Sequence, residues 1–164
     1  MTIDKATLDR HLAYTIWATN HLLNAASSVK QEELLHDFHT ADKNIVGTLA
    51  HVFAADRVWF DRVNGRRRTV FIEDRDRNLD TLRQEWPVLH QGWRQWLEGM
   101  EEGQIHEPIS YQDMAGNPYQ SMPWEIVLHV VNHGTHHRGQ VSGMIRALGL
   151  VPPQLDLIRF YRGL

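Results

Sequence analysis

The sequence has 164 residues, a net charge of −3 at pH 7 and no cysteine. This length suits one domain, over residues 1–164, that buries a single core. The absence of cysteine excludes disulfides, thiolate metal sites, iron–sulfur clusters and a cysteine nucleophile. The negative charge argues against a nucleic-acid-binding protein driven by overall charge. No apolar stretch is long enough for a membrane span and no signal-peptide pattern opens the chain, so we expect a cytoplasmic protein.

The spacing of apolar residues in the first half of the sequence predicts two long helices. The first covers residues 7–26, and either Asp4 or Thr7 is placed to cap its N-terminus. A polar stretch then interrupts the pattern. The second helix covers residues 44–63, with Asp42 as its predicted cap and an Asn-Gly pair directly after its last residue.

The second half of the sequence predicts two further long helices. The third carries apolar residues from position 79 to position 100 at near-heptad spacing, and it contains Pro87. Because a proline inside a helix removes one hydrogen bond and clashes with the preceding turn, we expect Pro87 to kink this helix or to restart it. The fourth helix begins near Pro123, with Ser121 as its predicted cap, and ends before Gly149.

The segments outside these helices complete the predicted fold. Residues 109–122 contain a strong turn signal between two short polar runs, which predicts a small β-hairpin or an ordered loop. The apolar residues of the segment 155–164 are expected to dock this tail on the helices. No βαβ pattern, glycine-rich nucleotide loop or internal repeat is present. The sequence therefore predicts an all-α fold, an antiparallel four-helix bundle with a short hairpin or loop between its third and fourth helices.

Four of the 11 histidines are concentrated in the fourth predicted helix. His129, His133 and His137 are four residues apart, which places them in a row on one face of that helix. Neutral imidazole nitrogens are good transition-metal ligands near pH 7, and two of them at this spacing can bind one ion. A helical projection puts His137 at the centre of the core face and His133 close beside it. We predict these two as the ligand pair, with His129 at the mouth of the site and His136 further out.

A tight site needs a third ligand from another helix. The second predicted helix offers His51 and Asp56, and the first offers two further histidines. We favour His51, although the projection places Asp56 deeper, and Asp56 could instead orient an imidazole by accepting its second N–H. The sequence lacks the His-Glu-x-x-His motif of zincin proteases and the paired Glu-x-x-His motifs of di-iron carboxylate bundles.

The other histidines and the tryptophans are interpreted as structural. We expect six histidines to be hydrogen-bonded core residues: His11, His21, His36, His39, His90 and His106. The tryptophans at helical spacing are predicted to belong to the core: Trp17, Trp59, Trp86, Trp93 and Trp96. Three consecutive arginines, at positions 66–68, are interpreted as a solvated turn, with an anion-binding site as the alternative.

Three stretches of the sequence, residues 12–20, 47–59 and 133–140, resemble motifs of the DinB/YfiT-like superfamily of four-helix-bundle proteins. The resemblance covers nearly the whole chain. It implies one divalent transition metal per chain, nickel or zinc, held by His51, His133 and His137. It also implies a homodimer. Related members of the superfamily are thiol-dependent transferases or isomerases that use mycothiol, bacillithiol or glutathione.

Three hypotheses about function follow from these observations. The first is a metal-dependent enzyme, of the hydrolase or thiol-dependent transferase type, that acts on a small-molecule substrate. Because the chain has no cysteine, any thiol nucleophile must then come from a low-molecular-weight cosubstrate. The second is a non-catalytic metal-binding or stress-response module. The third is a purely structural bundle with buried histidines. None of the three involves a nucleic acid or a membrane.

Overall fold

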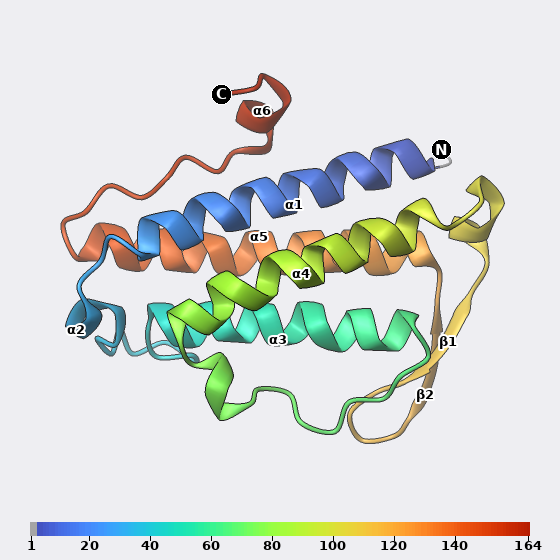
Figure 1. Cartoon of the computed structure of the whole chain (residues 1–164), viewed down its shortest axis with the longest axis horizontal. Helices are drawn as coiled ribbons and strands as arrows, with labels where there is room; N and C mark the ends of the chain where they lie inside the picture. The colour runs from blue at the N-terminus through green and yellow to red at the C-terminus, as the bar shows by residue number, and fades with distance from the viewer. Residues whose placement is uncertain (1–2) are drawn as a thin grey trace.

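The computed structural model describes residues 3–164, and over this range the chain is mostly helical with one small antiparallel sheet (Figure 1). Four long helices make up most of it: α1 (Lys5–Ala26), α3 (Ile45–Val63), α4 (Leu79–Glu98) and α5 (Pro123–Ala147). Two helices are short, α2 (Gln31–Leu34) and α6 (Leu157–Tyr161). Strands β1 (Ile109–Gln112) and β2 (Pro118–Ser121) form the hairpin. The four predicted long helices and the predicted hairpin are therefore confirmed.

The residues that cap the long helices differ in part from the predicted ones. Asp4 caps α1, because its carboxylate accepts a hydrogen bond of 2.8 Å from the backbone N–H of Thr7. The cap of α3 is Asn44 rather than Asp42, whose side chain turns toward a histidine of the same helix. The prediction of Ser121 as the cap of α5 is also wrong. Met122 occupies that position, and its backbone N–H is bound by Glu125 instead.

Pro87 lies inside α4 and does not restart the helix, which continues from Leu79 to Glu98. The side chain of Pro87 is exposed. The carbonyl of Arg83, four residues earlier, loses its helical partner at such a position. Since Arg83 is also exposed, water can satisfy that carbonyl, which explains why the helix tolerates the proline.

The four long helices pack side by side, with α1 and α3 each in contact with both α4 and α5 (Figure 1). Neighbours α3 and α5 run in opposite directions (Figure 1). In contrast, Phe53 contacts Trp86 and Phe60 contacts Trp93, so α3 and α4 run in the same direction. The expectation of a fully antiparallel arrangement is wrong for this pair and also for α1 and α5, which are in contact and run in the same direction (Figure 1). A crossover, residues 64–78, carries the chain back along the molecule before α4 begins (Figure 1).

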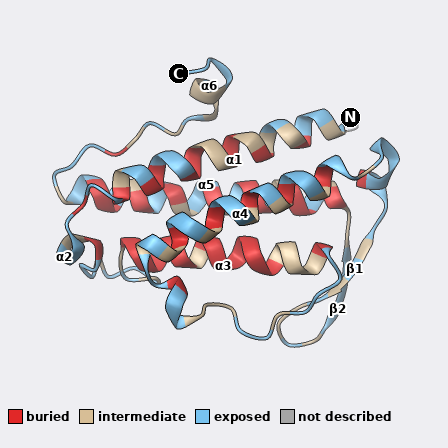
Figure 2. Ribbon diagram, in the orientation of Figure 1, coloured by how far each residue is buried: buried red, intermediate tan, exposed pale blue. Residues whose placement is uncertain are grey.

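Buried residues form a stripe along the inward face of α1, α4 and α5, whereas α3 is buried over most of its length (Figure 2). Trp86 and Trp93 are fully buried among them, as predicted. Trp17, Trp59 and Trp96 are only partly buried and pack against the edge of the core. The tail also docks as expected, because Leu155, Leu157 and Phe160 pack on the same cluster. Between residues 3 and 164, no helix combines the length and the apolar character that crossing a membrane requires.

A buried ion pair fastens the crossover to α3. Arg57 of α3 donates two hydrogen bonds to the carboxylate of Asp76, which is completely buried. The same carboxylate accepts a hydrogen bond of 2.8 Å from the backbone N–H of Glu73. Glu73 and Asp76 lie just before α4, so their contacts with Arg57 set where that helix starts along α3.

We expect Asp76→Asn to lower the free energy of unfolding by about 3 kcal/mol, because it leaves the buried Arg57 charge with only the more distant carboxylate of Glu73, 3.7 Å away. Urea denaturation followed by circular dichroism measures the change. The matched control is Asp74→Asn, an exposed carboxylate in the same turn, which should cost less than about 0.5 kcal/mol. Equal losses in the two variants would contradict this role of the ion pair.

Candidate metal centre

Three histidines from two helices converge at one point. His51 extends from α3, and His133 and His137 extend from α5. One ring nitrogen of each residue lies within 4.8 Å of the corresponding nitrogens of the other two. The Nε2 atoms of His51 and His133 are 3.2 Å apart, and the ring of His137 lies 4.5 Å from each of the other two ring centroids. The structure thus brings together the three residues that the sequence singled out.

The spacing and the protonation state of these rings fit a divalent metal ion. Two imidazole nitrogens bound to one tetrahedral zinc ion are about 3.3 Å apart, close to the separation of His51 and His133. Burial, together with the neighbouring histidines, lowers the pKa of His133 to about 4. Burial also lowers the pKa of His137. Both rings are therefore neutral near pH 7 and can offer a lone pair to a cation.

Two polar side chains orient the rings. Gln140 Oε1 lies 2.8 Å from His137 Nδ1, and because a carbonyl oxygen only accepts, Nδ1 carries the proton and Nε2 is left free. Asp42 Oδ1 lies 3.5 Å from His51 Nδ1, where a carboxylate favours the same tautomer. The Nδ1 atom of His133 is buried and has no hydrogen-bond partner among residues 3–164.

Aromatic rings surround the three histidines. Phe71, from the crossover, packs edge-on against His51 with a centroid distance of 5.3 Å. His129 stacks on His133 at 5.9 Å and also contacts Trp59 at 5.0 Å, so it lies beside the group and not in it. His136 packs edge-on against His137 at 4.9 Å and remains exposed.

The comparisons with known proteins agree with this architecture. The model of the DinB family matches residues 4–163. The chain belongs to the DinB family. One curated relative is Protein DinB of Bacillus subtilis (strain 168), which is 22% identical over an alignment of 151 residues that covers 87% of each chain. A solved DinB-like protein from Bacillus cereus ATCC 10987 superposes with a TM-score of 0.62 and 17% identity, covering 88% of this chain and 94% of that one. At this identity the likeness shows a common fold.

Asp56, the alternative to His51 on the second predicted helix, lies elsewhere in this DinB-family chain. Its carboxylate is buried in the core, where Oδ2 accepts a hydrogen bond of 2.9 Å from Trp86 Nε1. His90 Nε2 lies 3.9 Å from the same oxygen. The imidazole that Asp56 faces is thus on α4 and is not one of the three converging rings. Burial raises the pKa of Asp56 to about 7, although the hydrogen bond from Trp86 lowers it.

His90 is the one histidine, among those interpreted as structural, that is buried. Neither of its ring nitrogens has a hydrogen-bond partner among the described residues, contrary to the expectation of a satisfied core histidine. Burial lowers its pKa to about 3, and the positive charge of Arg138 adds to this effect. The others lie at or near the surface, which corrects the prediction that they belong to the core: His11, His21, His36, His39 and His106.

Arg138 explains several residues of the fourth-helix motif that have no role in metal binding. Its guanidinium is buried and donates hydrogen bonds to the hydroxyl groups of Thr15 on α1 and Thr135 on its own helix. A Cβ atom at position 134 would come within 2.7 Å of the guanidinium, so Gly134 leaves the space through which Arg138 reaches α1. The motif therefore combines two of the converging histidines on one face of α5 with an arginine that joins α5 to α1 on another.

Asp56 and His90 have opposite effects on the pH dependence of stability. Folded Asp56 keeps its proton up to about pH 7, whereas the unfolded chain releases it near 3.8, so rising pH destabilises the fold through this residue. Folded His90 stays neutral down to about pH 3, whereas the unfolded chain takes up a proton below 6.5. Falling pH therefore destabilises the fold through His90. Between pH 3.8 and pH 6.5, the pKa values of the two groups in the unfolded chain, the two contributions to stability oppose each other.

Asp56→Asn should remove only the first contribution. We expect its free energy of unfolding, relative to the unmodified protein, to rise by about 2–4 kcal/mol between about pH 4.5 and pH 7.5. His90→Gln should show the opposite trend over the same range. Urea denaturation at a series of pH values, in the presence of EDTA, measures both. A stability difference that is independent of pH in both variants would rule out this pair of titrations.

Proposed function

We propose that this DinB-family protein binds one divalent transition metal per chain, nickel or zinc, through His51, His133 and His137. The observation that carries the proposal is the convergence of three ring nitrogens within 4.8 Å of one another. Imidazole ligands suit both metals. The proposal treats α1, α3, α4 and α5 as one four-helix bundle that holds the ligands rigidly, and it includes the homodimer that the resemblance implies.

The ligands and their neighbours have distinct tasks in this proposal. His51 and His137 point their Nε2 lone pairs into the site because Asp42 and Gln140 hold the opposite nitrogens. His133 contributes a ring that burial keeps neutral. Phe71 packs edge-on against the ring of His51 and covers part of it. Binding of a cation thus requires little free energy of reorganisation, since the rings already face one another.

We further propose that the metal centre catalyses a reaction on a small molecule, either hydrolysis or the transfer of a thiol. A divalent cation supplies Lewis-acid chemistry, which lowers the pKa of water or of a thiol and polarises a carbonyl. No side chain of this chain can serve as a thiol nucleophile, so the thiol is a cosubstrate. His129 and His136, together with the carboxylate of Asp42, are titratable side chains beside the three rings, and they are the candidates for moving a proton there.

The metal content of protein purified without a histidine tag tests the first part of the proposal. We expect about one zinc or nickel ion per chain by mass spectrometry of the acid-digested protein, and its loss in His133→Ala. His136→Ala, which removes an exposed neighbouring ring, should retain the metal. Absence of metal from the unmodified protein after incubation with zinc and nickel would exclude the site.

Turnover tests the second part. The metal-loaded protein is incubated with a panel of esters and with thiol/electrophile pairs, with the EDTA-treated protein as the blank. A metal-dependent rate identifies the reaction class. Metal binding without a rate on any member of the panel would favour the non-catalytic metal-binding or stress-response module.

Gln140→Met should weaken metal binding by about 10- to 100-fold, because it removes the acceptor that holds His137 in the ligating tautomer. Gln140→Glu is the matched control, since a carboxylate oxygen at the same distance accepts the same hydrogen bond. Competition against a chromophoric zinc chelator measures both affinities. If Gln140→Met binds zinc as tightly as the unmodified protein, the orienting role of Gln140 is refuted.

A further inference from the structure

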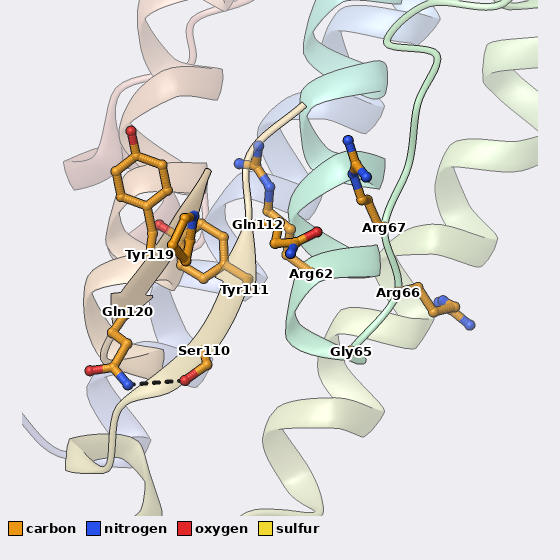
Figure 3. A pocket seen from close by; sticks show the side chains of 10 residues that line it. Arg62, Gly65, Arg66, Arg67, Ser110, Tyr111, Gln112, Tyr119 and Gln120 are labelled. Carbon is orange, nitrogen blue, oxygen red and sulfur yellow. Dashed lines mark hydrogen bonds between the residues drawn. The ribbon is translucent and has the colours of Figure 1, made fainter. Parts of the chain in front are cut away.

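A cavity of about 740 Å³ lies away from the three histidines, between the end of α3 and the hairpin (Figure 3). Its walls come from the first residues of the crossover and from both strands, and none of the three candidate ligands lines it. The volume is typical of pockets that bind small molecules. No part of the proposed metal chemistry uses this cavity.

The lining of the cavity is positively charged, although the protein as a whole is negative. Three arginines line it, Arg62, Arg66 and Arg67, and no aspartate or glutamate does. Arg66 is paired with Asp61 at 2.9 Å, and in Figure 3 its side chain points away from the hairpin. Among residues 3–164, neither Arg62 nor Arg67 takes part in a salt bridge. Two guanidinium groups are therefore available to an anion.

Arg62 is held in place by aromatic rings. Its guanidinium carbon lies 4.5 Å from the centroid of Trp59 and 5.3 Å from that of Tyr111. Burial lowers its pKa, but an arginine remains protonated at neutral pH. The carboxylate of Asp113 raises the pKa of Arg62, but its two oxygens accept hydrogen bonds of 2.8 Å from Asn117. A half-buried cation without a direct counter-ion is a strong anion-binding group.

The hairpin turn positions Arg67. Gly116 has a φ of +97°, a conformation that side chains rarely adopt, and a Cβ there would lie 3.2 Å from Arg67 Nη2. The same Nη2 donates a long hydrogen bond of 3.4 Å to the carbonyl of Met114. Arg67 therefore lies over the turn, and it is exposed. Arg62 and Arg67 direct their guanidinium groups to the same side in Figure 3.

The strands add flat aromatic surface beside these charges. Tyr111 and Tyr119 are directly opposite each other in the hairpin and stack with a centroid distance of 6.0 Å. Tyr119 is 51% exposed, so one side of its ring remains open to solvent. An exposed tyrosine face next to a free guanidinium offers both a stacking surface and a charge.

We propose that this cavity binds a small organic anion in which a phosphate or carboxylate is attached to a planar ring. The oxygens of the anion contact Arg62 and Arg67, and the ring lies against the exposed face of Tyr119, whose other side stacks on Tyr111. The inference is independent of the metal proposal. A row of rings nevertheless connects the two places, because Tyr111 contacts Trp59, Trp59 contacts His129, and His129 stacks on His133.

Isothermal titration calorimetry with phenyl phosphate, at low ionic strength and with EDTA present, tests the proposal. We expect binding to the unmodified protein that is weakened about tenfold or more in Arg62→Gln and in Arg67→Gln. Arg66→Gln is the matched control, because it removes the same charge from the same lining but from an arginine already paired with Asp61. It should change the affinity by less than about twofold. Inorganic phosphate and phenol, which each lack one half of the ligand, should bind more weakly than phenyl phosphate.

Several results would overturn the inference. These are no binding of phenyl phosphate, equal weakening in all three arginine variants, or phenol or inorganic phosphate binding as tightly as the complete probe. Since Arg67 is exposed, Arg67→Gln keeps the test valid even if Arg62→Gln does not fold. His133→Ala should bind phenyl phosphate like the unmodified protein, so failure of the metal proposal and failure of this one give different results.

Discussion

The packing of α3 against α5 determines which side chains can meet in this protein. Four-residue spacing places His133 and His137 on one face of α5, but their meeting with His51 depends on the rotation and the register of a second helix. One residue of rotation turns a helical side chain by about 100°, which would take His51 out of reach. Apolar residues from both helices, including Phe53 and Val141, are fully buried in one cluster and hold this register. The site is thus a consequence of core packing.

The same two helices present a second polar surface to the interior. Five residues separate His51 from Asp56, which turns the second side chain by about 140° around the axis, toward α4. On α5, Arg138 follows His137 and reaches toward α1. Buried polar groups of this kind cost free energy unless they are satisfied, and His90 is not. Their arrangement restricts the rotation of both helices, because any other rotation would leave a buried charge without its hydrogen-bond partners.

The sequence predicts the helices well because their signals are local. Apolar spacing identifies all four long helices, and Pro123 and Gly149 mark the ends of α5 to within two residues. The ladder of histidines on α5 is equally local. The choice between His51 and Asp56 does not depend on a local signal. A helical projection gives the angle between two residues but not the neighbouring helix that each one faces. The resemblance to DinB/YfiT proteins selected His51. The direction of α4 depends on the crossover, which has no periodicity to interpret.

The irregular segments contribute more to the environment of the sites than their sequence suggests. Asp42, interpreted as a helix cap, instead approaches the ring of His51. In the crossover, Phe71 covers the same ring and Arg67 lies over the hairpin turn. These contacts join residues far apart in the sequence, so no local pattern encodes them. Because Asp76 fastens the crossover to α3 by a buried ion pair, these segments have a defined conformation without belonging to a long helix. In this chain the helices supply the ligands, and the segments between them determine what else can reach the sites.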